Sequence, residues 1–150
     1  MTKTTEQKFQ LHANFFFEIT VENLKDLFCT MGQDSSYWCH DIVVGEIKQD
    51  SAGCYILEDN HEYEGNCVWV KDLTLDTKIK ILDIEEDEHE LQVRDVIKAI
   101  ENIVSGKTDL NTYDCGQVFE AFKDDNLGLI DSSIADSILQ ITTYNTLVYG

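Results

Sequence analysis

The chain has 150 residues, of which 29 are aspartate or glutamate and 11 are lysine or arginine, so the formal net charge is −18. This length fits one domain, and the 43 % apolar and 10 % aromatic content is too high for a disordered acidic tail. The negative field argues against direct binding to nucleic acid or to an anionic membrane, because such binders need clustered lysine and arginine. It favours cations or basic partners.

The first part of the chain predicts a strand followed by a helix. Residues 1–14 are polar, and we expect a loosely attached N-terminal segment ahead of a single domain at 15–150. Residues 15–21 mix aromatic and β-branched side chains, which is typical of a strand. Thr20 is then the expected N-cap of an amphipathic helix over 21–31 that ends at Gly32.

The middle of the chain predicts short, mostly extended elements. We expect, in order, a polar turn at 33–36, a strand or short helix around 43–47, a turn at 50–53, a short strand at 54–57, a polar acidic loop at 58–65 and an apolar run at 67–70. Residues 78–84 and 89–93 then predict an antiparallel hairpin whose turn carries Glu85 to Glu88.

The last third predicts helices. Apolar residues at helical spacing over 93–104 indicate a helix that Gly106 ends. A loop at 109–116, a short helix or strand around 118–122 and a turn-rich stretch at 127–130 come next. Asp131 is the expected N-cap of another amphipathic helix, and an extended tail at 146–150 is expected to dock on the body. The predicted fold is α+β, a single compact domain with short antiparallel hairpins and about three amphipathic helices.

No segment indicates export, membrane insertion or a bound group. The N-terminus lacks the apolar stretch and cleavage site of a signal peptide, and no run approaches the roughly 20 apolar residues that span a bilayer, so we expect a cytoplasmic protein. The five cysteines, at 29, 39, 54, 67 and 115, form no C-x-x-C pair and are interpreted as free thiols or small buried hydrophobes. Neither acidic stretch matches an EF-hand loop. We expect no metal and no cofactor.

Catalytic motifs are also missing from the sequence. It contains no glycine-rich phosphate loop, no G-x-S-x-G and no H-E-x-x-H, and the adjacent Cys39 and His40 do not by themselves make a nucleophile and base. We therefore expect a protein that is not an enzyme and has no catalytic residue.

Half of the net charge lies within residues 58–90, which hold 12 acids and three lysines. One interpretation is a solvated surface that keeps the protein soluble. The other is mimicry, in which carboxylates present the field of DNA to the basic groove of a nucleic-acid-binding enzyme. The candidate partner-binding residues are Glu58, Asp59, Glu62, Glu64, Asp83, Glu85, Glu86, Asp87, Glu88 and Glu90.

Tyr37 and Trp38 precede Cys39 in an aromatic block directly after the first predicted helix. Large aromatic side chains and cysteine are commonly buried, so the block fits core packing. Tyrosine and tryptophan are also favoured at interfaces, which makes Tyr37 and Trp38 candidate aromatic anchors.

Several blocks resemble a family of small acidic proteins encoded by phages and prophages of Gram-positive bacteria. The resemblance covers about residues 20–150 and rests on the helix–Gly–Tyr-Trp-Cys block at 27–39, the acidic hairpin at 83–91, the Asp-rich helix at 131–140 and the terminal Val-Tyr-Gly. The sequence departs from the family pattern at Gln33, where a second glycine is expected, and in the threonine-rich stretch 142–146. The resemblance implies a phage context and no catalytic residues.

Phage context favours the mimicry interpretation. The expected function is non-enzymatic inhibition of a host nucleic-acid-binding defence enzyme, similar to an anti-CRISPR protein, in the host bacterial cytoplasm. The partner would be the basic groove of a nuclease or CRISPR effector. The alternative is a module that sequesters a small ligand or nucleotide signal, with Tyr37, Trp38, Arg94 and Lys98 as the candidate pocket residues.

Overall fold

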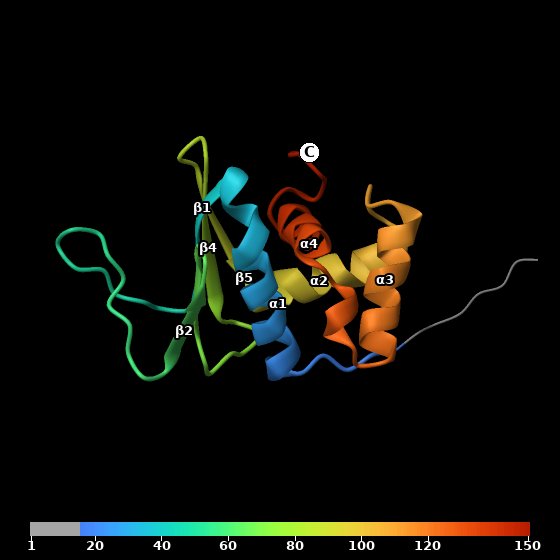
Figure 1. Ribbon diagram of the computed structural model, residues 1–150, viewed down its shortest axis with the longest axis horizontal. Helices are drawn as coiled ribbons and strands as arrows, with labels where there is room; N and C mark the ends of the chain where they lie inside the picture. The colour runs from blue at the N-terminus through green and yellow to red at the C-terminus, as the bar shows by residue number, and fades with distance from the viewer. Residues whose placement is uncertain (1–15) are drawn as a thin grey trace, which may run out of the picture.

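A computed structural model describes residues 16–150, so the predicted N-terminal segment 1–14 lies outside the described residues. Within that range the fold is α+β, as predicted, and it has four α-helices, where about three were expected, and a five-stranded mixed sheet. The helices lie on one side of the sheet, and a long loop at residues 45–60 projects from the other side (Figure 1). In the described range, no helix is both long and apolar enough to cross a membrane.

The sheet is built from two hairpins placed on either side of a central strand. Its strands are β1 Cys39–Val44, β2 His61–Glu64, β3 Cys67–Val70, β4 Lys78–Asp83 and β5 Glu88–Gln92, in the spatial order β2-β3-β1-β4-β5. The predicted hairpin of residues 78–93 is confirmed as β4 and β5. β1 runs antiparallel to β4 and parallel to β3, and the parallel pairing was not predicted.

The helices are α1 Val21–Asp34, α2 Val93–Val104, α3 Thr112–Lys123 and α4 Ser132–Tyr144, with 3₁₀ turns at Ser35–Tyr37 and Leu127–Leu129. Two predicted caps are confirmed. The Thr20 hydroxyl accepts from the Asn23 amide at 3.0 Å, and the Asp131 carboxylate accepts from the Ile134 amide at 2.8 Å. Each cap satisfies a helix amide that has no intrahelical partner.

Two predictions near α1 are wrong. Residues 16–20 form no strand, and their aromatic and β-branched side chains instead include Phe17 and Ile19, which pack against the helical core. Gly32 does not end the helix, which continues to Asp34. It is buried where α1 meets the β2–β3 turn, and a Cβ atom at Gly32 would lie 2.0 Å from the Glu64 carbonyl oxygen. Close approach of the two backbones therefore requires glycine at this position.

Three further predictions need correction. The acidic loop predicted at 58–65 contains β2, an edge strand whose polar side chains conceal the strand pattern. The strand predicted at 54–57 is only an isolated bridge between Gln49 and Tyr55. The loop predicted at 109–116 includes the first turns of α3, which the Asn111 side chain caps.

The core lies between the inner face of the sheet and the helices. Inward-facing strand residues pack against the apolar faces of α1, α2 and α4, and the most deeply buried include Ile42, Trp69, Ile81, Phe28, Ile103 and Ile138. This arrangement leaves the opposite face of the sheet without helices.

Candidate functional site

Three aromatic residues from distant parts of the chain meet at one end of the sheet. The Trp38 and Tyr149 rings stack with centroids 5.4 Å apart, and the Tyr144 ring lies 5.8 Å from Trp38 and 6.1 Å from Tyr149. We call Trp38, Tyr144 and Tyr149 the aromatic cluster. Trp38 is fully buried, so its role as a surface anchor is ruled out and core packing is correct for this residue.

A buried carboxylate satisfies the polar atoms of the Tyr-Trp block. Asp136, on α4, accepts from the Trp38 indole nitrogen at 2.5 Å and from the Tyr37 hydroxyl at 2.6 Å, and from the Gln140 amide at 3.0 Å. Burial, reinforced by the bond to Asp136, raises the pKa of Tyr37 above its ordinary value. The Tyr37 phenol therefore stays protonated and its hydroxyl is committed inside the fold, although the residue is half exposed.

Gln140 holds the C-terminal tail on this cluster. Its side-chain oxygen accepts from the Val148 and Tyr149 amides at 2.9 Å each, and its side-chain nitrogen donates to the Tyr149 carbonyl at 3.2 Å. The predicted docking of the tail is thereby confirmed. Asp136 and Gln140 were not singled out from the sequence, although two polar residues four positions apart beside the apolar face of a helix are a usable signal.

A second buried carboxylate fixes the β4–β5 turn. Asp83 is 3 % exposed and accepts from the His89 ring and the Tyr144 hydroxyl at 2.9 Å each. It also accepts from the backbone amides of Glu85 at 2.9 Å and Asp87 at 3.0 Å. Burial by itself would raise the pKa of Asp83, but these four donors outweigh it and lower the pKa to about 2.

The turn above Asp83 carries three exposed acids, Glu85, Glu86 and Asp87, which we call the acidic tip. The Ile84 amide donates to the Trp38 carbonyl at 2.8 Å, so the turn is tied directly to the aromatic cluster. None of the described lysine, arginine or histidine side chains forms an ion pair with the tip. The turn stands at the same end of the molecule as the C-terminus (Figure 1).

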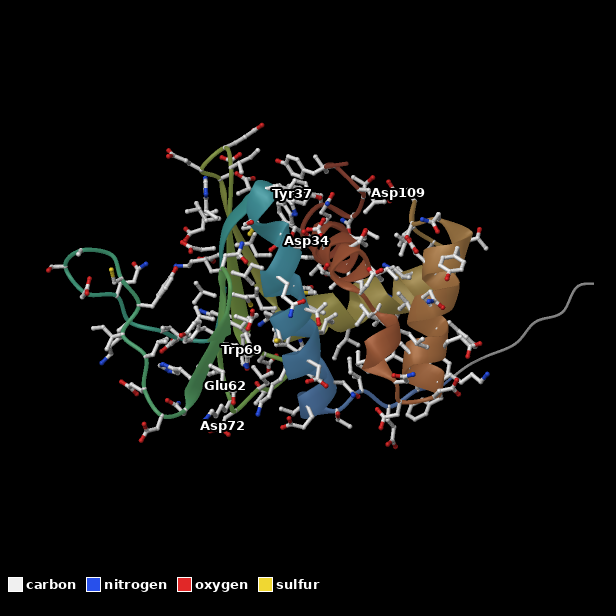
Figure 2. The ribbon with its side chains drawn as sticks, viewed as in Figure 1. Asp34, Tyr37, Glu62, Trp69, Asp72 and Asp109 are labelled. Carbon is white, nitrogen blue, oxygen red and sulfur yellow. The ribbon has the colours of Figure 1, made fainter. Side chains whose placement is uncertain are left out.

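The ten predicted partner-binding acids do not share one face. Asp83 is buried, so it does not belong to a partner-binding surface. Glu62 and Glu64 lie on β2, at the opposite edge of the sheet from β5, and Glu62 pairs with Lys71 at 3.8 Å. Figure 2 shows Glu62 and Asp72 at the end of the molecule away from Tyr37. The remaining surface acids lie in two places. Three form the acidic tip, and Glu58, Glu88 and Glu90 lie on the helix-free side of the sheet. Asp59 is exposed in the loop at residues 45–60.

The residues expected for small-ligand binding are dispersed. Trp38 is buried, Tyr37 is bonded to Asp136, Arg94 pairs with Asp76 and Lys98 pairs with Glu101 at 3.7 Å. None of these four candidates lines the groove over the helix-free face or the shallow cleft between α2 and α3. Neither of these two cavities is therefore the ligand site predicted from the sequence.

The cysteines are separate thiols. All five are free, Cys39 and Cys67 are buried and Cys54 is exposed. Burial, as the main cause, raises the pKa of Cys39 to about 12, which makes it a poor nucleophile. Among residues 16–150, no group of three histidine, cysteine, aspartate or glutamate side chains is placed to hold a metal ion.

Comparison with known protein families, with curated proteins and with solved structures gives no match for this chain.

Proposed function

We propose that this protein is a non-enzymatic, phage-encoded inhibitor that inserts its acidic tip into the basic groove of a host nucleic-acid-binding defence enzyme. The observation that carries the proposal is that the β4–β5 turn combines one buried acid with three exposed acids. One buried carboxylate fixes the turn from inside, and the three acids of the tip stay outside without an ion pair.

The acidic tip places three exposed acids in consecutive positions, a dense negative charge that suits a phosphate-binding surface. Each strand of duplex DNA carries one phosphate charge per about 3.4 Å of axis. Arginine pairs strongly with both carboxylates and phosphates, so a groove that binds one can bind the other. The net charge of −18 would further accelerate the encounter with a basic partner.

The internal fixing of the turn matters because a rigid loop loses less conformational entropy on binding. Two backbone amides of the turn donate to Asp83, and the Ile84 amide donates to the Trp38 carbonyl. Asp83 is in turn held by His89 and Tyr144, so the turn is attached to both β5 and α4. Such preorganisation raises affinity without adding contacts.

The test compares a tip-neutral variant, E85Q/E86Q/D87N, with a matched control, E18Q/E101Q/D124N, which removes three exposed acids elsewhere. Each chain is used to capture proteins from a bacterial host lysate, with and without nuclease treatment. We expect the native chain and the control to retain a nucleic-acid-binding enzyme after nuclease treatment, and duplex DNA to displace it. The tip-neutral variant should lose it. Equal capture by all three chains would refute a role for the tip.

A further inference from the structure

A second surface lies on the helix-free side of the sheet. The loop at residues 45–60, which we call the arm, leaves the end of β1 and projects from this face (Figure 1). Between the arm and the outward residues of β1, β4 and β5 lies a groove of about 770 Å³, which we call the arm groove. Its volume falls within the range of about 300–1,000 Å³ that is usual for ligand sites.

The arm groove has an apolar floor. Val43 and Leu82 point outward from β1 and β4, because their neighbours Ile42 and Ile81 face the core. Ile47 of the arm adds to this floor. Farther along the arm, Ile56 and Leu57 are 47 % and 43 % exposed. Ile56 and Leu57 do not line the groove; within it Val43 is 8 % exposed and Ile47 and Leu82 are partly exposed, so the floor offers an occupant a small apolar surface.

The charges around the floor are negative on balance. The groove is lined by five acids, Asp41, Glu46, Glu58, Glu88 and Glu90, and by three lysines, Lys48, Lys78 and Lys80. Lys80 pairs with Glu88 at 3.2 Å, and this pair leaves four acids against two lysines in the lining. This balance favours a cationic occupant over an anionic one. It also disfavours a second copy of the chain, which would bring two charges of −18 together.

We propose that the arm groove binds an extended peptide segment in which apolar and basic side chains alternate. In an extended chain, successive side chains point to opposite sides and those on one side repeat about every 6.6 Å. Apolar side chains would enter the floor around Val43 and Leu82, and basic ones would meet Glu58 on the arm side and Glu90 on β5. The acidic tip does not line the groove, so this inference stands independently of the proposed function.

The test measures binding of the full chain to three fluorescein-labelled ten-residue peptides by fluorescence anisotropy. One peptide alternates arginine and valine, one arginine and serine, and one glutamate and valine. We expect the arginine–valine peptide to bind at least tenfold more tightly than the arginine–serine peptide, and the glutamate–valine peptide not to bind. Equal affinities for the two arginine peptides would overturn the proposal, because the general negative field would then explain all binding.

Three variants locate the site. E58Q/E90Q should weaken the arginine–valine peptide about tenfold, whereas E101Q/D124N, with the same charge change outside the groove, should not. K78E, which makes an exposed groove lysine acidic, should tighten binding. Equal weakening by both double variants would overturn the proposal, as would loss of binding in K78E. A native dimer in sedimentation that Ile47→Asp converts to monomer would assign the groove to a second copy instead.

Discussion

Replacing Asp83 by asparagine tests whether this buried carboxylate stabilises the fold in its charged form. The native environment lowers the pKa of Asp83 from 3.8 to about 2. Such a shift corresponds to about 2 kcal/mol of folding free energy at neutral pH, at about 1.4 kcal/mol per pKa unit. The asparagine side chain keeps an acceptor for part of the network but carries no charge. We therefore expect D83N to lose about 2 kcal/mol at pH 7.

The pH dependence gives the sharper measurement. Because the folded pKa of Asp83 lies below the unfolded value, its contribution is complete well above pH 4 and disappears as the pH falls through about 2. The stability difference between the native chain and D83N should therefore shrink to about 1 kcal/mol at pH 3. Urea unfolding at several pH values measures both free energies, and the many other carboxylates cancel in the difference.

A control variant in the same turn distinguishes the buried Asp83, which should stabilise the fold, from an exposed acid of the acidic tip. Glu85 is exposed and its side chain forms no ion pair within the described chain, so E85Q should not show the loss of about 2 kcal/mol expected for D83N at pH 7. A gap between native and D83N that stays constant from pH 7 to pH 3 would refute the reasoning. A loss below about 0.5 kcal/mol at pH 7 would do so as well, since the four donors would then contribute no net stability.

Other consequences of the packing can be measured directly. Gly32→Ala should lower the free energy of unfolding in urea by about 3 kcal/mol, because its Cβ would lie 2.0 Å from a carbonyl oxygen. The control Gly116→Ala, in open space on α3, should raise it by about 0.5–1 kcal/mol. Equal effects of the two substitutions would contradict the close approach of the backbones at Gly32. Tyr149→Ala should cost about 2 kcal/mol and shift tryptophan emission to longer wavelength as Trp38 loses its stacked ring, and an unchanged spectrum would show that the tail is not docked. A thiol-reactive dye should modify Cys54 first, and a fast phase that survives C54S would place the exposed thiol elsewhere.

Local signals in the sequence predicted the elements that depend on nearest neighbours along the chain. The helix over 93–104 has regular apolar spacing, β4 alternates imperfectly ahead of a polar acidic turn, and the caps at Thr20 and Asp131 directly precede helical apolar spacing. β2 was missed because it lies at the sheet edge, where a strand needs little apolar alternation. The role of Gly32 could not be predicted, because the sequence does not distinguish a glycine that lets two backbones approach from a glycine that ends a helix.

Contacts between distant residues account for what could not be predicted of the site. The acids of 83–90 belong to one hairpin, and the sequence does not show which of them is buried. Packing buries Asp83 and leaves Glu85, Glu86 and Asp87 exposed. Asp83 reaches Tyr144 across 61 positions, and Trp38 reaches Asp136 across 98. The aromatic block, the hairpin, α4 and the tail lie apart in the sequence, and the fold brings them together.

The acidic tip is costly to hold, and that cost bears on its role. Glu86 has a φ of 65°, a left-handed conformation that disfavours a residue with a Cβ atom by about 1 kcal/mol. Its neighbours Glu85 and Asp87 are also negatively charged, and no described lysine, arginine or histidine forms an ion pair with them. If these carboxylates served the fold, E85Q/E86Q/D87N would be destabilised. If they serve a partner, neutralisation should instead stabilise the chain by about 0.5 kcal/mol at low salt, and the gain should vanish in 1 M salt, where screening already weakens the repulsion.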